Sequence, residues 1–178
     1  MSGVLHGLAL PLREHTVVLP SAAIAEIIPY EKPDRILESP PWLVGILNWR
    51  GIHTPLTYLE LMESHLTFET VNNLESEINH DFLIVILNRI YEIKGAGLKT
   101  EENQKYPFFA IVIEHMPKLL RLTSEMIHVV ADLSDKSPRF LMEVTIKTEQ
   151  AFIPNLISLW KMIDALPPRL QWFQQITI

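Results

Sequence analysis

The fold of this chain is decided by PPWLVGILNWRGIHTPL, residues 40–56. The adjacent prolines fix φ and remove backbone donors, so the chain enters this stretch in an extended conformation. Two short apolar segments follow, joined by the polar corner 48–51, in which Gly51 tolerates positive φ and Asn48 can bond its own backbone. Gly45 has no side chain, which lets a neighbouring segment approach closely or the strand bend. The stretch predicts a hairpin that holds a guanidinium and an indole rigidly at its turn.

Short strands are predicted on both sides of this hairpin. Residues 82–87 and 108–113 are continuous apolar runs of strand length, which is typical of strands buried on both faces. Residues 140–147 alternate between apolar and polar positions, and residues 151–154 return as a partner strand. Apolar residues at helical spacing then predict a helix that ends at Leu166, before two prolines. The whole chain, residues 1–178, is interpreted as a single all-β or β-rich, barrel-like domain with few short helices.

Two polar stretches and the C-terminal tail interrupt this pattern. Residues 63–80 are predicted to be the most mobile loop, and residues 94–105 form a second polar connection. The tail, residues 169–178, keeps several large apolar side chains and is predicted to pack on the rest of the protein.

Composition excludes several classes of protein. The formal charge of −6 and the lack of a lysine- or arginine-rich run argue against a nucleic-acid footprint. The chain has no cysteine, so it has no disulfide, thiolate metal site or cysteine nucleophile. No apolar run approaches the roughly 20 residues that span a bilayer, and the first residues do not resemble a signal peptide. We therefore expect a soluble, cytoplasmic protein that does not insert into a membrane.

No catalytic constellation is evident. The seven histidines lack metal-ligand spacing, so no metal site is expected. The glycines of residues 95–100 do not match a phosphate-binding loop, and no cofactor is expected. Ser158 and Lys161 match Ser-x-x-Lys, but the partner motifs of that enzyme class are missing. Ser158 is interpreted as a helix cap and Lys161 as a solvated side chain, so the sequence does not predict an enzyme.

Two interpretations of Arg50 remain open at this point. Arg50 could simply pair with a nearby carboxylate, with Trp42 and Trp49 in the core. Alternatively Arg50 is a recognition residue, because loops on rigid scaffolds concentrate such residues and because tryptophan and arginine dominate interface hot spots. A rival from another class is a small β-barrel module that binds a ligand or nucleic acid, which salt-sensitive retention on single-stranded DNA would support.

The same residues resemble the CheW family of bacterial chemotaxis coupling proteins. The family pattern is a valine-x-glutamate stretch, a proline-rich lead-in, Gly-x-x-Asn-Leu-Arg-Gly, and then Pro-Val-x-Asp-Leu. In this chain the order and spacing agree over residues 24–27, 40–41, 44–51 and 55–56. The departures are Trp49 in place of leucine, Tyr58 in place of aspartate, residues 108–110 in place of a Gly-Leu step, and Glu114 near a later aspartate of the family.

The resemblance implies a fold of two small five-stranded β-barrel subdomains that share a core, with short helices including one near the C-terminus. It implies a non-enzymatic adaptor in the cytoplasm, recruited to membrane-associated receptor arrays. Its partners would be the regulatory domain of a CheA-type histidine kinase and the cytoplasmic tip of a methyl-accepting chemoreceptor. By position, the partner-binding residues would be Ile24, Glu26, Ile27, Asn48, Trp49, Arg50 and Gly51.

The departures from the pattern suggest a divergent paralogue. On divergence alone, it is assigned to a chemosensory system other than flagellar steering, such as the one that controls type IV pili and twitching motility. A scaffold that has lost kinase coupling is the alternative, because Tyr58 and Phe109 occupy positions that have drifted from the pattern.

Overall fold

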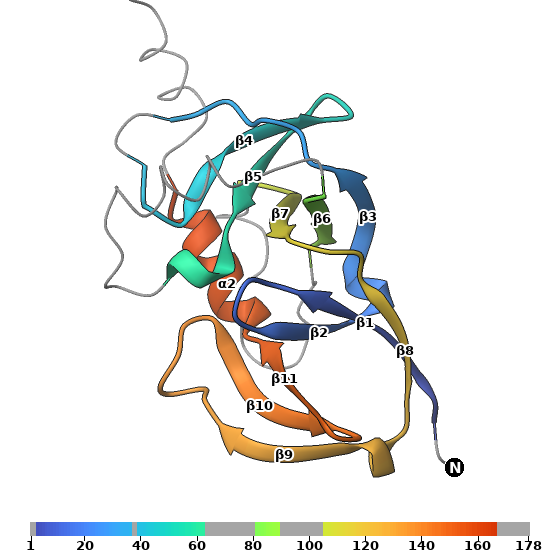
Figure 1. The fold of residues 1–178 in the computed structure, drawn as a ribbon. Coiled ribbons are helices and arrows are strands. Elements are labelled where there is room, and N and C mark those ends of the chain that lie inside the picture. Colours follow the sequence, from blue (N-terminus) through green and yellow to red (C-terminus); the bar gives the residue numbers. More distant parts are fainter. Residues whose placement is uncertain (1–2, 37–38, 63–80, 90–104, 167–178) are drawn as a thin grey trace, which may run out of the picture.

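In the described part of the chain, two β-sheets are followed by one α-helix (Figure 1). The structure is a computed structural model that describes residues 3–36, 39–62, 81–89 and 105–166. The predictions for residues 63–80, for 94–104 and for the tail 169–178 lie outside these ranges. The elements are β1 (Leu5–Pro11), β2 (Thr16–Pro20), η1 (Ser21–Ala23), β3 (Ile24–Pro29), β4 (Leu43–Trp49), β5 (Ile52–Thr57), η2 (Leu59–Met62), β6 (Leu83–Asn88), β7 (Phe108–Ile113), β8 (Lys118–Leu122), η3 (Ser124–Met126), β9 (Ile127–Asp132), β10 (Phe140–Ile146), β11 (Glu149–Pro154) and α2 (Leu156–Asp164).

The first sheet has the strand order β8-β1-β2-β11-β10-β9. Its two edge strands are consecutive in the sequence, since only Thr123 and the short η3 turn separate β8 from β9. In Figure 1 this segment descends as β8, turns and runs along the bottom of the view as β9, next to β10. One bent segment therefore supplies both edges of the sheet. β2 and β11 pair in parallel, and the other neighbours are antiparallel.

The second sheet has the order β3-β6-β7-β5-β4, so β3 and β4 are its opposite edges. A bridge beyond the end of β3 draws these edges together. The Asp34 N–H donates to the Ile46 carbonyl at 2.9 Å, and the Ile46 N–H donates to the Asp34 carbonyl at the same distance. A Cβ atom on Gly45 would lie 2.5 Å from the Asp34 oxygen and 2.9 Å from Pro33 Cβ. The prediction that Gly45 admits a neighbouring segment is confirmed.

The predicted all-β class, with a helix near the C-terminus, is confirmed. The two sheets differ in detail from the expected five-stranded barrels. Within the described residues each sheet is an open row of paired strands, one of six strands and one of five. The sixth strand of the first sheet arises because the chain bends sharply at η3. If β8 and β9 are counted as one bent strand, five strands remain.

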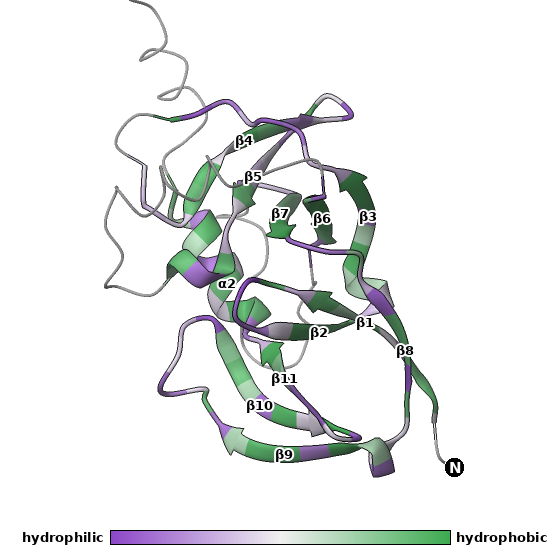
Figure 2. Ribbon diagram, viewed as in Figure 1, coloured by the Kyte–Doolittle hydropathy of each residue, from purple (hydrophilic) through white to green (hydrophobic). Residues whose placement is uncertain are grey.

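The strands β6 and β7 lie between two hydrophobic clusters. Alternate residues of β6, such as Val85 and Leu87, pack into the core between the sheets, while Ile84 and Ile86 pack into the interior of the second sheet. This explains why both strands are apolar along their length, as Figure 2 shows in dark green. The prediction that residues 82–87 and 108–113 form strands buried on both faces is therefore confirmed. The residues of a third cluster all come from strands of the first sheet.

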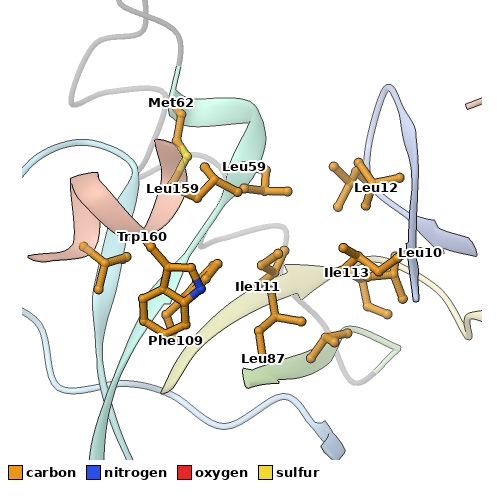
Figure 3. Packing of buried hydrophobic residues seen from close by; sticks show 14 of the residues in the cluster. Leu10, Leu12, Leu59, Met62, Leu87, Phe109, Ile111, Ile113, Leu159 and Trp160 are labelled. Carbon is orange, nitrogen blue, oxygen red and sulfur yellow. The ribbon is translucent and has the colours of Figure 1, made fainter. Parts of the chain in front are cut away.

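The helix α2 closes the core between the sheets. Trp160 packs edge-on against Phe109 with ring centroids 4.7 Å apart, and Leu159 lies beside them (Figure 3). The prediction that Ser158 caps the helix is wrong, because the Asn155 side chain accepts from the Ser158 N–H at 3.1 Å. Ser158 is therefore the capped residue, since the side chain that accepts the free amide is three residues earlier.

An ion pair fixes the end of α2 to the second sheet. Arg89, which follows β6, binds both carboxylate oxygens of Asp164, with 3.1 Å from one Arg89 NH group to Oδ1. The same guanidinium donates to the Tyr106 carbonyl at 2.6 Å and lies 4.4 Å from the centre of the Trp160 ring. The Arg89 side chain is only 9% exposed, so Asp164 supplies the counter-charge that stabilises this nearly buried guanidinium.

A polar cluster joins the two sheets beside η2. Glu60 accepts from the Glu14 N–H at 2.6 Å, and its carboxylate lies 3.4 Å from His15 Nδ1, both in the β1–β2 turn. Arg139, before β10, is 4% exposed and donates to the Leu59 carbonyl at 3.4 Å. Burial lowers the pKa of the Arg139 guanidinium, and the charges of Glu60 and Glu14 oppose that shift. These contacts hold η2 against the first sheet.

Candidate functional site

The site is built on the hairpin that joins β4 and β5. Trp49 pairs with Ile52, so only two residues connect the strands. Arg50 has φ 51° and Gly51 has φ 77°, and positive φ at both central positions defines the type I′ turn that suits tight hairpins. The predicted tight turn is confirmed in this stretch. Asn48 does not belong to the turn, because it pairs with His53 within the strands.

Arg50 is exposed to solvent at the turn, and Glu26 and Trp49 contact its guanidinium. Its guanidinium donates to Glu26 on β3 at 3.0 Å, and it lies 5.1 Å from the centre of the Trp49 ring. The Arg50 side chain is nevertheless 68% exposed, against 33% for Glu26. The interpretation that Arg50 pairs with a nearby carboxylate is therefore confirmed, while its role in recognition stays a prediction for a side chain that is mostly exposed. The hydrophilic tip of the hairpin is visible in Figure 2.

Trp49 ties the turn to the opposite edge of the sheet. Its indole Nε1–H donates to Glu26 Oε2 at 2.8 Å, which joins β4 to β3, the two opposite edge strands of the second sheet. Its ring packs edge-on against Phe108, at the start of β7, with centroids 4.9 Å apart and planes at 73°. Phe108 is not among the site residues predicted from the sequence. A second aromatic residue next to the core residue Phe109, at the half-buried first position of a buried strand, was the signal that could have marked it.

The other candidate residues occupy different positions. Ile24 and Ile27 lie on β3 with Glu26, but they are half-buried and pack against the core between the sheets. Asn48 is exposed on β4. The structure thus brings Glu26, Trp49 and Arg50 into direct contact, with Gly51 beside them in the turn. Ile24 and Ile27 support the strand that carries Glu26, and Asn48 forms no part of this contact set.

Two positions that depart from the CheW pattern are also in contact. Tyr58 is 4% exposed, and its hydroxyl donates to Glu114 Oε1 at 2.9 Å. Burial, and then the hydrogen bond to Glu114, raise the pKa of the Tyr58 phenol. Tyr58 therefore remains a neutral donor, and the pair ties the end of β5 to the end of β7.

The described residues hold little that suggests catalysis. They contain no group of three or more histidine, aspartate or glutamate side chains that could hold a metal ion. Ser158 and Lys161 lie on α2, and the serine's backbone is engaged by the Asn155 cap. In the same part of the chain, no helix has the length and apolar character needed to cross a membrane. What the site offers is a rigid cation on an aromatic ring, which is suited to binding.

Comparison with known proteins gives one family and one type of fold. The family model described as "CheW-like domain" matches residues 6–164. The crystal structure of the scaffolding protein TtCheW from Thermoanaerobacter tengcongensis is similar, with a TM-score of 0.61 and 15% sequence identity, over 88% of this chain and 86% of that chain. At this identity the similarity concerns the fold. Curated protein sequences give no significant match.

Proposed function

Because the chain belongs to the CheW-like domain family, we propose that it is a non-enzymatic adaptor that couples the cytoplasmic tips of chemoreceptors to a CheA-type histidine kinase. The observation that carries the proposal is the rigid presentation of Arg50. A two-residue turn, an ion pair with Glu26 and the Trp49 ring hold one exposed cation in a fixed place. Pre-positioned side chains lose little entropy on binding, which is what an adaptor surface needs.

The energetics of the Arg50–Glu26 pair favour a role in binding over a role in stability. An exposed ion pair contributes at most about 1 kcal/mol to folding, and often less. Removing either side chain should therefore leave the fold intact. At an interface the same arginine would be desolvated by a partner, where such residues commonly account for about 2 kcal/mol or more.

Calorimetric titration of the purified protein tests the proposal. The titrants are the regulatory domain of the CheA-type kinase and a receptor-tip hairpin from the same genome. We expect binding in the micromolar range that Arg50→Ala and Glu26→Ala each weaken about thirtyfold, with unchanged cooperative unfolding. Lys161→Ala removes an exposed cation from α2 and is the matched control. Loss of cooperative unfolding in Arg50→Ala would make Arg50 structural, and absence of binding to both titrants would refute the adaptor role.

We further propose that the system served is the one that controls type IV pili and twitching motility. The support is the divergence from the family pattern at Trp49 and Tyr58. Deletion of the gene should then abolish twitching and leave swimming unchanged. Loss of swimming would assign the protein to flagellar chemotaxis instead.

A further inference from the structure

The carboxylate of Glu26 is occupied by groups of its own chain. Oε2 accepts from the Trp49 indole at 2.8 Å and lies 3.0 Å from the Arg50 guanidinium, and Oε1 accepts from the same guanidinium at 3.0 Å. Both oxygens are therefore engaged before any partner arrives. Arg50 is twice as exposed as Glu26 and has further N–H groups to donate. The guanidinium is thus the polar group that a partner meets at this turn.

Phe108 fixes the indole that completes this arrangement. Phe108 pairs with Asn88 at the end of the β6–β7 ladder, and its ring meets the Trp49 ring edge-on. An edge-on contact depends strongly on geometry, so it limits the rotation of the indole. The orientation of the indole in turn directs its N–H to Glu26 and its face to Arg50. A chain of contacts therefore leads from the buried strand β7 to the exposed cation.

We propose that Phe108 and Trp49 are positioning residues that determine which partner this surface accepts. Together they hold the Glu26 carboxylate through the indole N–H, beside Arg50, and leave the exposed N–H groups of the guanidinium on an aromatic ring. Such a surface fits a partner segment that presents a carboxylate beside an apolar side chain, because the carboxylate pairs with the guanidinium and the apolar group covers the ring. The inference rests on the proposed function and names the partner chemistry of the same site.

One arm of the test needs no partner. The indole N–H signal of Trp49 is identified in a nitrogen–proton NMR spectrum by its loss in Trp49→Phe. We expect Glu26→Ala to shift this signal and speed its exchange with water, and Phe108→Leu to do the same. Phe82→Leu is the control, because Phe82 packs against the same hydrophobic cluster. An indole signal that Phe108→Leu leaves unchanged would overturn the positioning role.

The second arm measures binding to the kinase regulatory domain and the receptor-tip hairpin. Trp49→Phe keeps an aromatic ring but removes the N–H donor together with the pyrrole part of the indole, so we expect at least about tenfold weaker binding, the effect of losing one hydrogen bond to a charged group. Phe108→Leu should give a similar loss and Phe82→Leu less than about twofold. In a Glu26→Ala background, Trp49→Phe should add almost nothing, because the acceptor is already gone.

Salt concentration tests the partner chemistry. Binding that uses a carboxylate on Arg50 should weaken as salt is raised, and Arg50→Gln should remove most of that dependence. Native affinity in Trp49→Phe and Phe108→Leu would overturn the specificity role, and salt-independent binding would overturn the acidic partner. If native protein binds neither titrant, the proposed function fails, and the NMR arm still decides whether Phe108 positions the indole.

Discussion

Replacing Gly45 with alanine should open the second sheet at the bridge that joins its edges. A Cβ atom there would lie 2.5 Å from the Asp34 carbonyl oxygen, whereas carbon–oxygen contacts in sheets are about 3.3 Å or longer. The Asp34 backbone must therefore move by about 0.8 Å. That movement breaks two hydrogen bonds of 2.9 Å with Ile46, each worth about 1 kcal/mol. The contact with Pro33 adds about 1 kcal/mol of overpacking.

The expected cost of Gly45→Ala is thus about 3 kcal/mol in the free energy of unfolding. Urea denaturation measures the cost, and hydrogen exchange at the Asp34 and Ile46 amides reports on the bridge itself. Gly51→Ala is the matched control, because Gly51 has φ 77° but open space around it. Its cost is the left-handed backbone alone, about 1 kcal/mol. The reasoning is refuted if Gly45→Ala costs no more than Gly51→Ala and both amides stay protected.

Two further predictions concern the other polar contacts. Asp164→Asn should lower the free energy of unfolding, measured by urea denaturation, by about 3 kcal/mol, because Arg89 is 9% exposed and would lose its counter-charge. The double variant Arg89→Met, Asp164→Leu should recover most of this loss. If it does not, the packing of the two side chains matters more than their charges. The raised pKa of Tyr58 means that the folded state holds the phenolic proton more tightly than the unfolded state, so this contribution to stability is complete below about pH 10 and declines above it. The free energy of unfolding, measured from about pH 8 to about pH 11, should decline less steeply in Tyr58→Phe than in the native protein. Equal slopes would assign the alkaline loss of stability to other groups.

The sequence predicts those parts of the fold whose signal is local. Residues 82–87 and 108–113 are apolar at every position because each strand faces a different core on each side, and that requirement is visible without the structure. The signal for the hairpin turn is equally local. Gly51 must take positive φ, and it lies between Trp49 and Ile52, the last pair of the strands that the turn joins. Gly45 was correctly linked to a close approach, although the approaching segment could not be named.

The site could be predicted only in part, because its contacts join distant segments. Glu26 and Trp49 are 23 residues apart and lie on opposite edges of the sheet, and periodicity does not say that those edges meet. The role of Phe108 depends on the same closure. The prediction of the helix cap fails for another reason. Asn155 and Ser158 are both good capping residues, and only the backbone conformation decides where the helix begins.

The backbone of Arg50 bears on why an arginine stands at the turn. The first central position of a type I′ turn favours asparagine, aspartate or glycine, and another residue with positive φ costs about 1 kcal/mol. The exposed pair with Glu26 returns about 1 kcal/mol at most. The two contributions roughly cancel, so folding stability gives no reason to place an arginine at this turn. The proposed role in partner recognition would supply that reason, since the strained position projects the guanidinium from a rigid hairpin and keeps it exposed on the Trp49 ring.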